Sequence, residues 1–307
     1  MTLGADGLLV SADGHIVAER LVLAYGPVQV AFTALDSGVR FVAREPHRRF
    51  CVTDAPVPDL TLSWEFGHFQ PSSDPVVQNG GDVWEARPIS SGGEEIVFYE
   101  TPARLPALRL HIDKDLRRGR VTETPLGRQA RDVNVGRYPF DEFVVSRLLS
   151  RTHGLLLHAS AVILDGAAIV FVGHSGAGKS TISQLMEEAG LEVMTDDRTI
   201  LTCEGAVVHA WGTPWHGSRR RALARRSPVR AMFLLKQAET HEVSPALAQQ
   251  TAVKELFVRL IQPRVKGDEV ANCLDALAEV TGRVPLRELH FARSSSAATF
   301  VLDMLAS

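Results

Sequence analysis

The spacing of apolar residues divides the chain into a β-rich first part and a mixed second part. Up to about residue 115, short runs rich in Val, Leu and Phe alternate with clusters of Gly, Pro, Asn and Ser that are typical of turns. These runs predict strands at 21–25, 28–35, 39–43, 61–66, 96–100 and 108–112. The stretch from Asp113 to Gly136 is rich in Arg and Gly and shows no apolar period, so we interpret it as a linker or an exposed crossing.

From Pro139 onward, helical and strand-like patterns follow each other closely. Apolar residues at helical spacing predict a helix that ends near Thr152. The apolar runs 155–164 and 167–172 are joined by Asp165-Gly166, and an Asp-Gly pair in this position is a strong hairpin signal. A second hairpin is predicted across Glu204-Gly205, between strands at 199–203 and 206–211.

The remaining elements also follow from periodicity. Ser244-Pro245 is predicted to open a helix that carries Val253, Leu256, Phe257 and Leu260 and ends near Pro263. Further strands are predicted at 191–194, 229–235 and 284–291, and further helices at 181–189, 268–280 and 298–305. We therefore predict an α/β protein with a β-rich N-terminal region, 1–135, and a second domain, 136–307.

Composition excludes several classes of protein. The 307 residues carry a net charge of -3, which does not favour bulk binding to nucleic acid or to an anionic membrane. We see no signal peptide at the N-terminus and no apolar run long enough to span a membrane. The 3 cysteines are odd in number and far apart, which argues against a disulfide framework and suits a cytoplasmic location.

The stretch GHSGAGKST contains the most specific chemical signal in the chain. It fits the pattern G-x-x-x-x-G-K-[ST] in full, after an apolar strand and at the start of a predicted helix. Glycines there let backbone N–H groups surround an anion, the lysine reaches the β- and γ-phosphates, and the serine hydroxyl binds Mg²⁺. We predict ATP and Mg²⁺ as ligands, with a nucleotide-binding loop made of Gly173, His174, Ser175, Gly176, Ala177, Gly178, Lys179, Ser180 and Thr181.

Two adjacent carboxylates follow this loop after one short helix. Asp196 and Asp197 come 17 and 18 positions after Lys179, at the end of a predicted strand. If that strand returns beside the strand before the loop, both carboxylates lie at the phosphate end of the sheet. One carboxylate there can hold Mg²⁺, and another can accept the proton of an attacking hydroxyl.

The loop, the helix and MTDD together resemble the kinase core of the HPr serine kinase/phosphorylases. The similarity is greater to the HPr-kinase-like proteins of bacterial peptide-modification gene clusters, and it covers roughly residues 139 to 260. PEP carboxykinases share this fold, so the resemblance implies a mixed-sheet, PEP carboxykinase-like P-loop kinase core. It also leaves a homo-oligomer open, since HPr kinases are hexamers.

By position, the resemblance implies catalytic roles for Asp196, Lys179 and His158. Asp196 is favoured as the base and Asp197, with Ser180, as the Mg²⁺ ligand, although spacing alone does not separate the two aspartates. His158 lies where the family carries a histidine before the hairpin, and the alternative is an ordinary core histidine.

Two further features could contact an acceptor. The segment 218–230 holds six arginines, of which Arg219 and Arg220 are candidates for clamping an anionic group. A solvated, merely structural surface would explain them as well. Trp215, in the turn GTPWHG, is a further candidate, and aromatic packing is its alternative.

The leading hypothesis is therefore an ATP- and Mg²⁺-dependent kinase whose acceptor is an alcohol, in particular a serine hydroxyl of a peptide or protein. A second hypothesis is a small-molecule kinase that acts on a free amino acid or a sugar. A third is a non-catalytic, ATP-binding sensor module. The chain has no LSGGQ-like signature and no NKxD element, which argues against an ABC-type ATPase and a GTPase.

Overall fold

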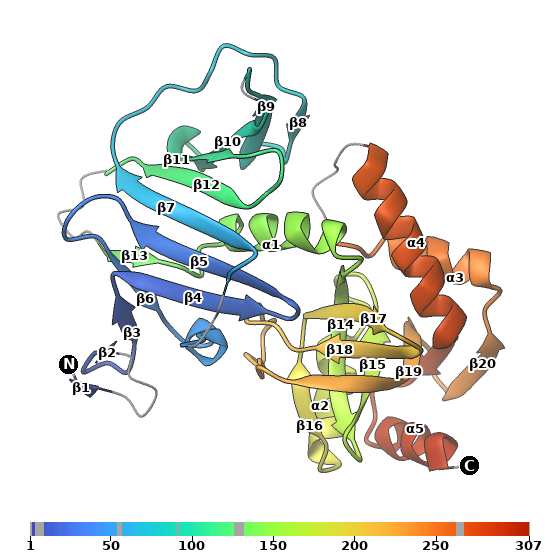
Figure 1. Cartoon of the computed structure of the whole chain (residues 1–307). Coiled ribbons are helices and arrows are strands. Elements are labelled where there is room, and N and C mark those ends of the chain that lie inside the picture. Colours follow the sequence, from blue (N-terminus) through green and yellow to red (C-terminus); the bar gives the residue numbers. More distant parts are fainter. Residues whose placement is uncertain are drawn as a thin grey trace. The chain divides into compact units, whose positions relative to one another are not determined.

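The computed structural model describes residues 2–3, 9–53, 57–90, 92–125, 132–261 and 267–306 (Figure 1). The chain divides into two compact units, and the border between the described parts lies between Leu148 and Leu149. The domain boundary predicted between residues 135 and 136 stays a prediction of the sequence. Both units contain sheets with parallel and antiparallel pairs, the helix Phe140–Arg151 lies mainly in the first unit and the later helices lie in the second, so the protein is a mixed α/β structure.

The first unit consists mainly of two sheets. Its larger sheet has the order β4 (Arg20–Tyr25), β5 (Val28–Ala34), β7 (Leu60–Phe66), β12 (Arg118–Glu123), β11 (Leu105–Ile112), β10 (Glu94–Glu100), β9 (Trp84–Pro88) and β8 (Gln78–Asn79). Its smaller sheet has the order β1 (Thr2–Leu3), β2 (Leu9–Val10), β3 (Ile16–Ala18), β6 (Arg40–Ala43) and β13 (Asp132–Asn134). The six strands predicted before residue 113 are all present.

Aromatic side chains connect the two sheets of the first unit. Phe41 on β6 lies 5.8 Å from Phe32 and 6.3 Å from Trp64, measured between ring centroids. Trp64 in turn lies 5.5 Å from Phe140, at the start of helix α1 (Phe140–Arg151). Large rings with fixed edge-to-face neighbours bury much apolar surface and give this core a defined shape.

The predicted linker between Asp113 and Gly136 is wrong. Its residues 118–123 form β12, which pairs antiparallel with β11 and parallel with β7 in the middle of the larger sheet. The inward positions of this strand include Gly119 and Val121, and its outward neighbours Arg118 and Arg120 are exposed. Buried and exposed residues do alternate along this strand. The first buried position is a glycine and not an apolar side chain, so the alternation is not visible in the sequence. Residues 126–131 of the predicted linker lie outside the described residues.

The second unit is built around one mixed sheet. Its order is β15 (Ala167–Val172), β14 (Leu155–Leu164), β17 (Arg198–Glu204), β18 (Val207–Trp211), β19 (Arg226–Gln237), β21 (Leu286–Phe291) and β20 (Glu242–Ala246). The short strand β16 (Glu192–Thr195) pairs with β14, and not with β15, the strand before the loop, which was the arrangement considered from the sequence; β15 pairs with β14 and β19. The pairs β15–β19 and β19–β21 are parallel, and the other pairs are antiparallel.

Both predicted hairpins of the second unit are confirmed. Asp165 and Gly166 have φ of 51° and 80°, which is the left-handed backbone that a two-residue hairpin turn requires. They connect β14 and β15 in antiparallel register, and Glu204-Gly205 lies in the turn that connects β17 and β18 in the same way.

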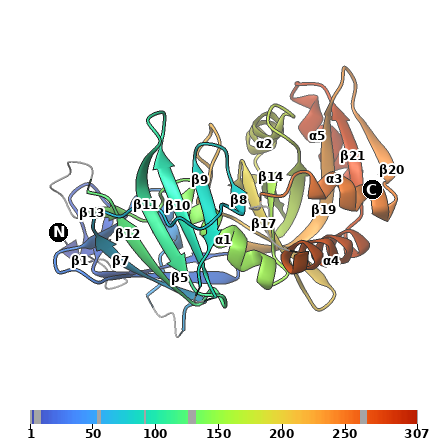
Figure 2. The same ribbon diagram turned by 90° about the horizontal axis from the view of Figure 1, so that it is seen from above.

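Helices cover two faces of this sheet (Figures 1 and 2). Alternate residues of β14 enter two separate cores. Leu157 and Ala161 pack toward α3 (Gln249–Phe257) and α4 (Gly267–Arg283), whereas Val162 packs toward α2 (Lys179–Glu188) and α5 (Ser296–Ala306). A strand that is buried on both sides is apolar along its length, which is the pattern that the sequence shows at 155–164.

One predicted helix begins in the wrong place. Ser244-Pro245 lies inside the edge strand β20, and α3 begins only at Gln249. Proline is tolerated at a sheet edge, so its presence does not distinguish a helix start from an edge strand. Leu256 of this helix is fully buried, but Phe257 is 41% exposed, and Leu260 follows after the helix has ended. The predicted end at Pro263 lies outside the described residues.

Candidate functional site

The glycine-rich segment connects β15 to α2, as its pattern predicts. All nine candidate residues lie between the end of β15 and the first turn of α2. Gly176 and Gly178 have φ of 81° and 106°, a backbone that side chains disfavour. A Cβ at Gly173 would lie 2.7 Å from that of Ala177, so this glycine permits the loop to fold back on itself. His174, Ser175 and Gly176 are exposed at the outer part of the loop.

Lys179 is the first residue of α2, and its side chain turns back over the loop. It is only 6% exposed, and its Nζ donates hydrogen bonds to the carbonyl oxygens of Gly173 at 2.9 Å and His174 at 3.1 Å. Burial lowers the pKa of Lys179, and the nearby positive charges of Arg198 and Arg259 act in the same direction against the opposing effect of Asp197. The lysine therefore lies within electrostatic range of the Asp197 carboxylate.

Ser180 and Thr181 follow in the same helical turn and are half-buried. The first four N–H groups of a helix have no acceptor inside the helix, and they carry the positive end of its dipole. The start of α2 therefore offers an anion both backbone donors and favourable charge, next to the ammonium group of Lys179.

The aspartate pair lies in the bend between β16 and β17, beside the start of the loop. Both strands pair with β14, where Thr195 is opposite Ala161 and Arg198 is opposite His158. The backbone N–H of Ala159 donates to the carbonyl oxygen of Asp197 at 3.1 Å. On the other edge of β14, the N–H of Gly173 donates to the carbonyl oxygen of His158 at 3.1 Å. One strand thus brings the bend and the loop together.

The two carboxylates differ in what they contact. Asp196 is 1% exposed, and its two oxygens accept the backbone N–H groups of Gly217 and Arg219, each at 2.9 Å. Asp197 keeps 23% of its side chain exposed and forms an ion pair with the neighbouring Arg198. Asp196 therefore holds the backbone of the segment 217–219, whereas the Asp197 carboxylate is accessible to a ligand.

His158 lies between these groups on β14 and is half-buried. Its Nδ1 is buried without a hydrogen-bond partner in the part of the chain that the structure describes. Burial lowers its pKa, with Arg198 and Lys179 adding to the effect and Asp197 opposing it, so its surroundings favour the neutral ring. The structure thus brings His158, Lys179 and Asp197 into one electrostatic cluster.

Sequence reasoning missed two arginines of this cluster. Arg198 directly follows the aspartate pair, and its importance appears only from its ion pair with Asp197. Arg259 comes from the segment after α3, where its carbonyl oxygen accepts the N–H of His158 at 2.9 Å. The side chain of Arg259 is 11% exposed and pairs with Glu255 at 2.7 Å. No sequence pattern links Arg259 to the loop, because β14 brings them together only in the folded chain.

The predicted acceptor residues do not form a single clamp. Arg219 pairs with Glu187 on α2 at 3.0 Å, and Arg221 pairs with the same carboxylate at 2.7 Å. Arg225, Arg226 and Arg230 contact three other carboxylates, those of Glu192, Glu204 and Asp165. Arg220 is exposed and has φ of 55°. Trp215 is 6% exposed, so its ring offers little surface to an acceptor.

The donor set is compatible with Mg²⁺ in a nucleotide complex. Among the described residues, no three His, Cys, Asp or Glu side chains gather as a metal site made by protein alone. Mg²⁺ does not require such a site, because in phosphate-transfer enzymes it takes one or two protein oxygens and completes its shell with phosphate and water. The partly exposed Asp197 carboxylate and the Ser180 hydroxyl are the protein oxygens that could serve in this way.

Comparison with known proteins gives partial matches. The family model described as SynChlorMet cassette protein ScmC matches residues 132–257, which include the loop and the aspartate pair but are less than half of the chain. A solved structure, the Hpr(Ser) kinase/phosphatase from Coxiella burnetii, is similar with 11% sequence identity and a TM-score of 0.29. That match covers 49% of this chain and 93% of the other, and a likeness this distant carries no argument about function.

No curated protein matches the chain. Within the described residues, none of the helices has both the length and the apolar character that a membrane span requires.

Proposed function

We propose that this protein is an ATP- and Mg²⁺-dependent kinase that transfers the γ-phosphoryl group to an alcohol, namely a serine hydroxyl of a peptide or protein. The observation that supports this most is that β14 holds the start of the glycine-rich loop on one edge and the backbone of Asp197 on the other, through Gly173 N–H to the His158 carbonyl oxygen and Ala159 N–H to the Asp197 carbonyl oxygen, each at 3.1 Å. A loop of this kind binds phosphates, and an accessible carboxylate next to it is what phosphoryl transfer adds to simple nucleotide binding.

In this proposal, backbone N–H groups of the loop and of the first turn of α2 bind the phosphates. Lys179 exchanges the carbonyl oxygens of Gly173 and His174 for phosphate oxygens, which needs only a turn of its side chain. Ser180 and Asp197 would hold Mg²⁺, which would supply positive charge to neutralise the phosphates. The core would then be the mixed-sheet, PEP carboxykinase-like type that the sequence resembles.

We assign Asp196 a positioning role in place of the predicted role as base. Both of its oxygens already accept backbone N–H groups, and it is almost fully buried. His158 directly precedes Ala159, whose N–H holds the backbone of Asp197, and its lowered pKa favours the neutral ring, so we assign it the acceptor's proton. Phosphoryl transfer depends mainly on positioning and charge, so we expect the loss of this histidine to cost less than the loss of Lys179.

The test is phosphotransfer from γ-labelled ATP to serine-containing peptides, including those encoded by neighbouring genes, followed by mass spectrometry. Lys179→Ala should lower the rate by about a hundredfold or more, because an electrostatic contact made to the transferred group is lost. Lys254→Ala is the matched control, since Lys254 is an exposed lysine on α3. Full turnover in Lys179→Ala would contradict the proposal, and so would ATP binding without transfer to any hydroxyl.

A further inference from the structure

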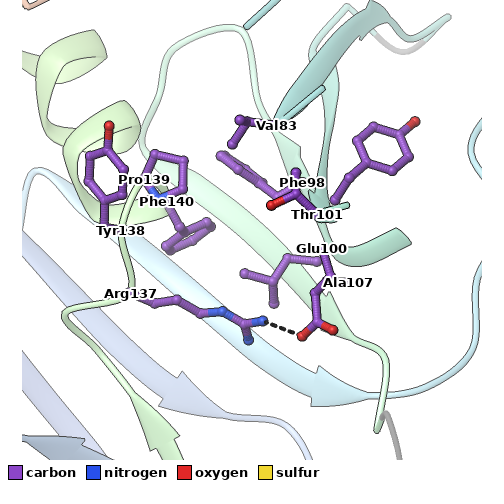
Figure 3. A pocket seen from close by; sticks show the side chains of 11 residues that line it. Val83, Phe98, Glu100, Thr101, Ala107, Arg137, Tyr138, Pro139 and Phe140 are labelled. Carbon is purple, nitrogen blue, oxygen red and sulfur yellow. Dashed lines mark ion pairs between the residues drawn. The ribbon is translucent and has the colours of Figure 1, made fainter. Parts of the chain in front are cut away.

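The first unit contains a pocket of about 400 Å³ that the proposed chemistry does not use. It lies between β10, β11 and the segment that leads into α1 (Figure 3). Its walls combine buried aromatic and aliphatic side chains with a few polar groups. A concave, largely apolar site of this size with a small number of polar groups is the usual form of a ligand pocket.

The floor of the pocket is apolar and fixed in place. Phe98 and Phe140 are 4% and 1% exposed, and their ring centroids lie 5.4 Å apart with the planes 66° from parallel. Ala107 and Leu108 on β11 are equally buried. Packing holds these side chains in place and leaves little of their own surface open, so the apolar surface that a ligand can still cover comes mainly from the exposed ring of Tyr138.

At the pocket, two carboxylates lie near a single guanidinium group, that of Arg137. Arg137 forms a short ion pair, 2.6 Å, with Glu123, a carboxylate that is 5% exposed and also accepts the Trp64 Nε1–H at 3.1 Å. Its other contact, with Glu100, is 3.7 Å long, beyond hydrogen-bond range. The Glu100 side chain is 43% exposed. Two carboxylates therefore share one guanidinium, and the accessible one leaves a net negative charge at the rim.

An exposed aromatic ring completes the rim. Tyr138 is 66% exposed, and Figure 3 shows it on the far side of Phe140 from Glu100. An aromatic face next to an apolar floor binds both hydrocarbon and cationic groups, which is why tyrosine is enriched where proteins bind peptides. The rim thus offers a carboxylate and a π-face, and no unpaired positive charge among the described residues that line the pocket.

We propose that this pocket binds a peptide segment in which an apolar side chain stands next to a lysine or arginine. The apolar side chain packs against the ring of Tyr138 above the floor formed by Phe98 and Phe140, and the cation pairs with Glu100. An acidic neighbour in the peptide meets the same net negative charge and is disfavoured. The proposal names the class of acceptor for the kinase proposed above, and so it rests on that function.

The test measures peptide binding to the full chain by calorimetric titration without nucleotide. The probe is acetyl-Gly-Phe-Lys-Gly-amide, compared with the same peptide carrying Glu in place of Lys, or Ala in place of Phe. We expect the Glu peptide to bind about fivefold more weakly, as for an exposed ion pair replaced by repulsion. We expect the Ala peptide to bind about thirtyfold more weakly, because its apolar contact with Tyr138 in the pocket is lost.

A charge reversal in the protein makes the test decisive. Glu100→Lys should bind the Glu peptide more tightly than the Lys peptide. Glu19→Lys, the same change at an exposed site of the first unit, should keep the original preference. Binding of no peptide at millimolar concentration would overturn the proposal, and so would an unchanged preference in Glu100→Lys. Tighter binding of 2-phenylethylammonium than of the Phe-Lys peptide would overturn it too, because the pocket would then serve a small molecule.

The binding test is separable from the phosphotransfer test. Lys179→Ala should bind the Phe-Lys peptide with unchanged affinity, because Lys179 does not line this pocket. If Lys179→Ala loses transfer but still binds the peptide, the loop acts in transfer and the pocket acts in peptide binding, as proposed. If the wild type transfers phosphate but does not bind the peptide, the pocket proposal is wrong and the proposed function stands.

Discussion

The carboxylate of Asp196 accepts the backbone N–H of Arg219 at 2.9 Å, across 23 positions of sequence. The same carboxylate accepts the N–H of Gly217, and a Cβ at Gly217 would lie 3.2 Å from its oxygen. The side chain of Arg219 then pairs with Glu187 on α2. Asp196 thus fixes the segment after the GTPWHG turn against the bend that carries Asp197, and the paired aspartates have separate tasks.

We therefore predict that Asp196→Asn mainly lowers stability, whereas Asp197→Asn mainly lowers phosphotransfer activity. Asp196→Asn places an amide N–H₂ against one backbone N–H, so it should cost about 1–3 kcal/mol of stability and lower the midpoint of thermal unfolding. Asp197→Asn should leave that midpoint almost unchanged, because its ion pair is partly exposed, but it should abolish phosphotransfer. Equal loss of stability in both variants would contradict this division of roles.

The glycines at the two ends of α2 allow a test of the loop's geometry. Gly178 and Gly190 have φ of 106° and 92°, so alanine at either position is strained. Only at Gly178 does a Cβ also collide, at 2.7 Å from Cζ of Phe291, whereas nothing lies within 4 Å at Gly190. Gly190→Ala should cost about 1 kcal/mol and leave nucleotide affinity intact.

Gly178→Ala should cost more and should also weaken binding of a fluorescent ATP analogue, because the loop must shift to relieve the contact. The two variants are compared by thermal unfolding and by titration with the analogue. The same nucleotide affinity in both would show that the contact with Phe291 does not hold the loop in its binding conformation.

The pH dependence of stability should report the burial of His158. Burial lowers its pKa in the folded protein, with help from Arg198 and Lys179, so the folded state resists protonation. As pH falls below about 6.5, the unfolded chain takes up a proton that the folded chain does not, and stability is lost. Above that pH both states are neutral at this residue and the effect vanishes.

We expect the unfolding midpoint of the wild type to fall more between pH 7.5 and pH 5 than that of His158→Gln. Other titrating groups are shared by both proteins, so the difference between the two curves isolates this histidine. His68→Gln is the control, since His68 is exposed in the first unit. Parallel curves for the wild type and His158→Gln would contradict the prediction.

The parts of the site that were predictable are those encoded in contiguous sequence. The loop is a run of nine residues, and the hairpin at Asp165-Gly166 fixed how the strand before it must pair. In each case, local turn chemistry and the length of one element leave few alternatives for the fold.

The parts that were not predictable depend on contacts between distant segments. Arg259 reaches the site because its carbonyl oxygen pairs with His158, and nothing near Arg259 in the sequence indicates this. The buried state of Asp196 depends on N–H groups more than twenty positions away. A carboxylate that binds backbone groups and one that binds a metal ion have the same appearance in a sequence.

The strand β12, which was interpreted from the sequence as part of a linker, contains a closely packed glycine. A Cβ at Gly119 would lie 2.8 Å from Cδ2 of Leu62 and 2.9 Å from Cδ1 of Leu110, so glycine lets three neighbouring strands approach at this point. Gly119→Ala should therefore destabilise the first unit by about 1–3 kcal/mol through overpacking. If the segment were an exposed linker, the same change would be neutral or slightly stabilising. Thermal unfolding distinguishes the two cases. Gly67→Ala is the control, because its Cβ would meet only the Thr122 side chain at 3.5 Å and should have little effect.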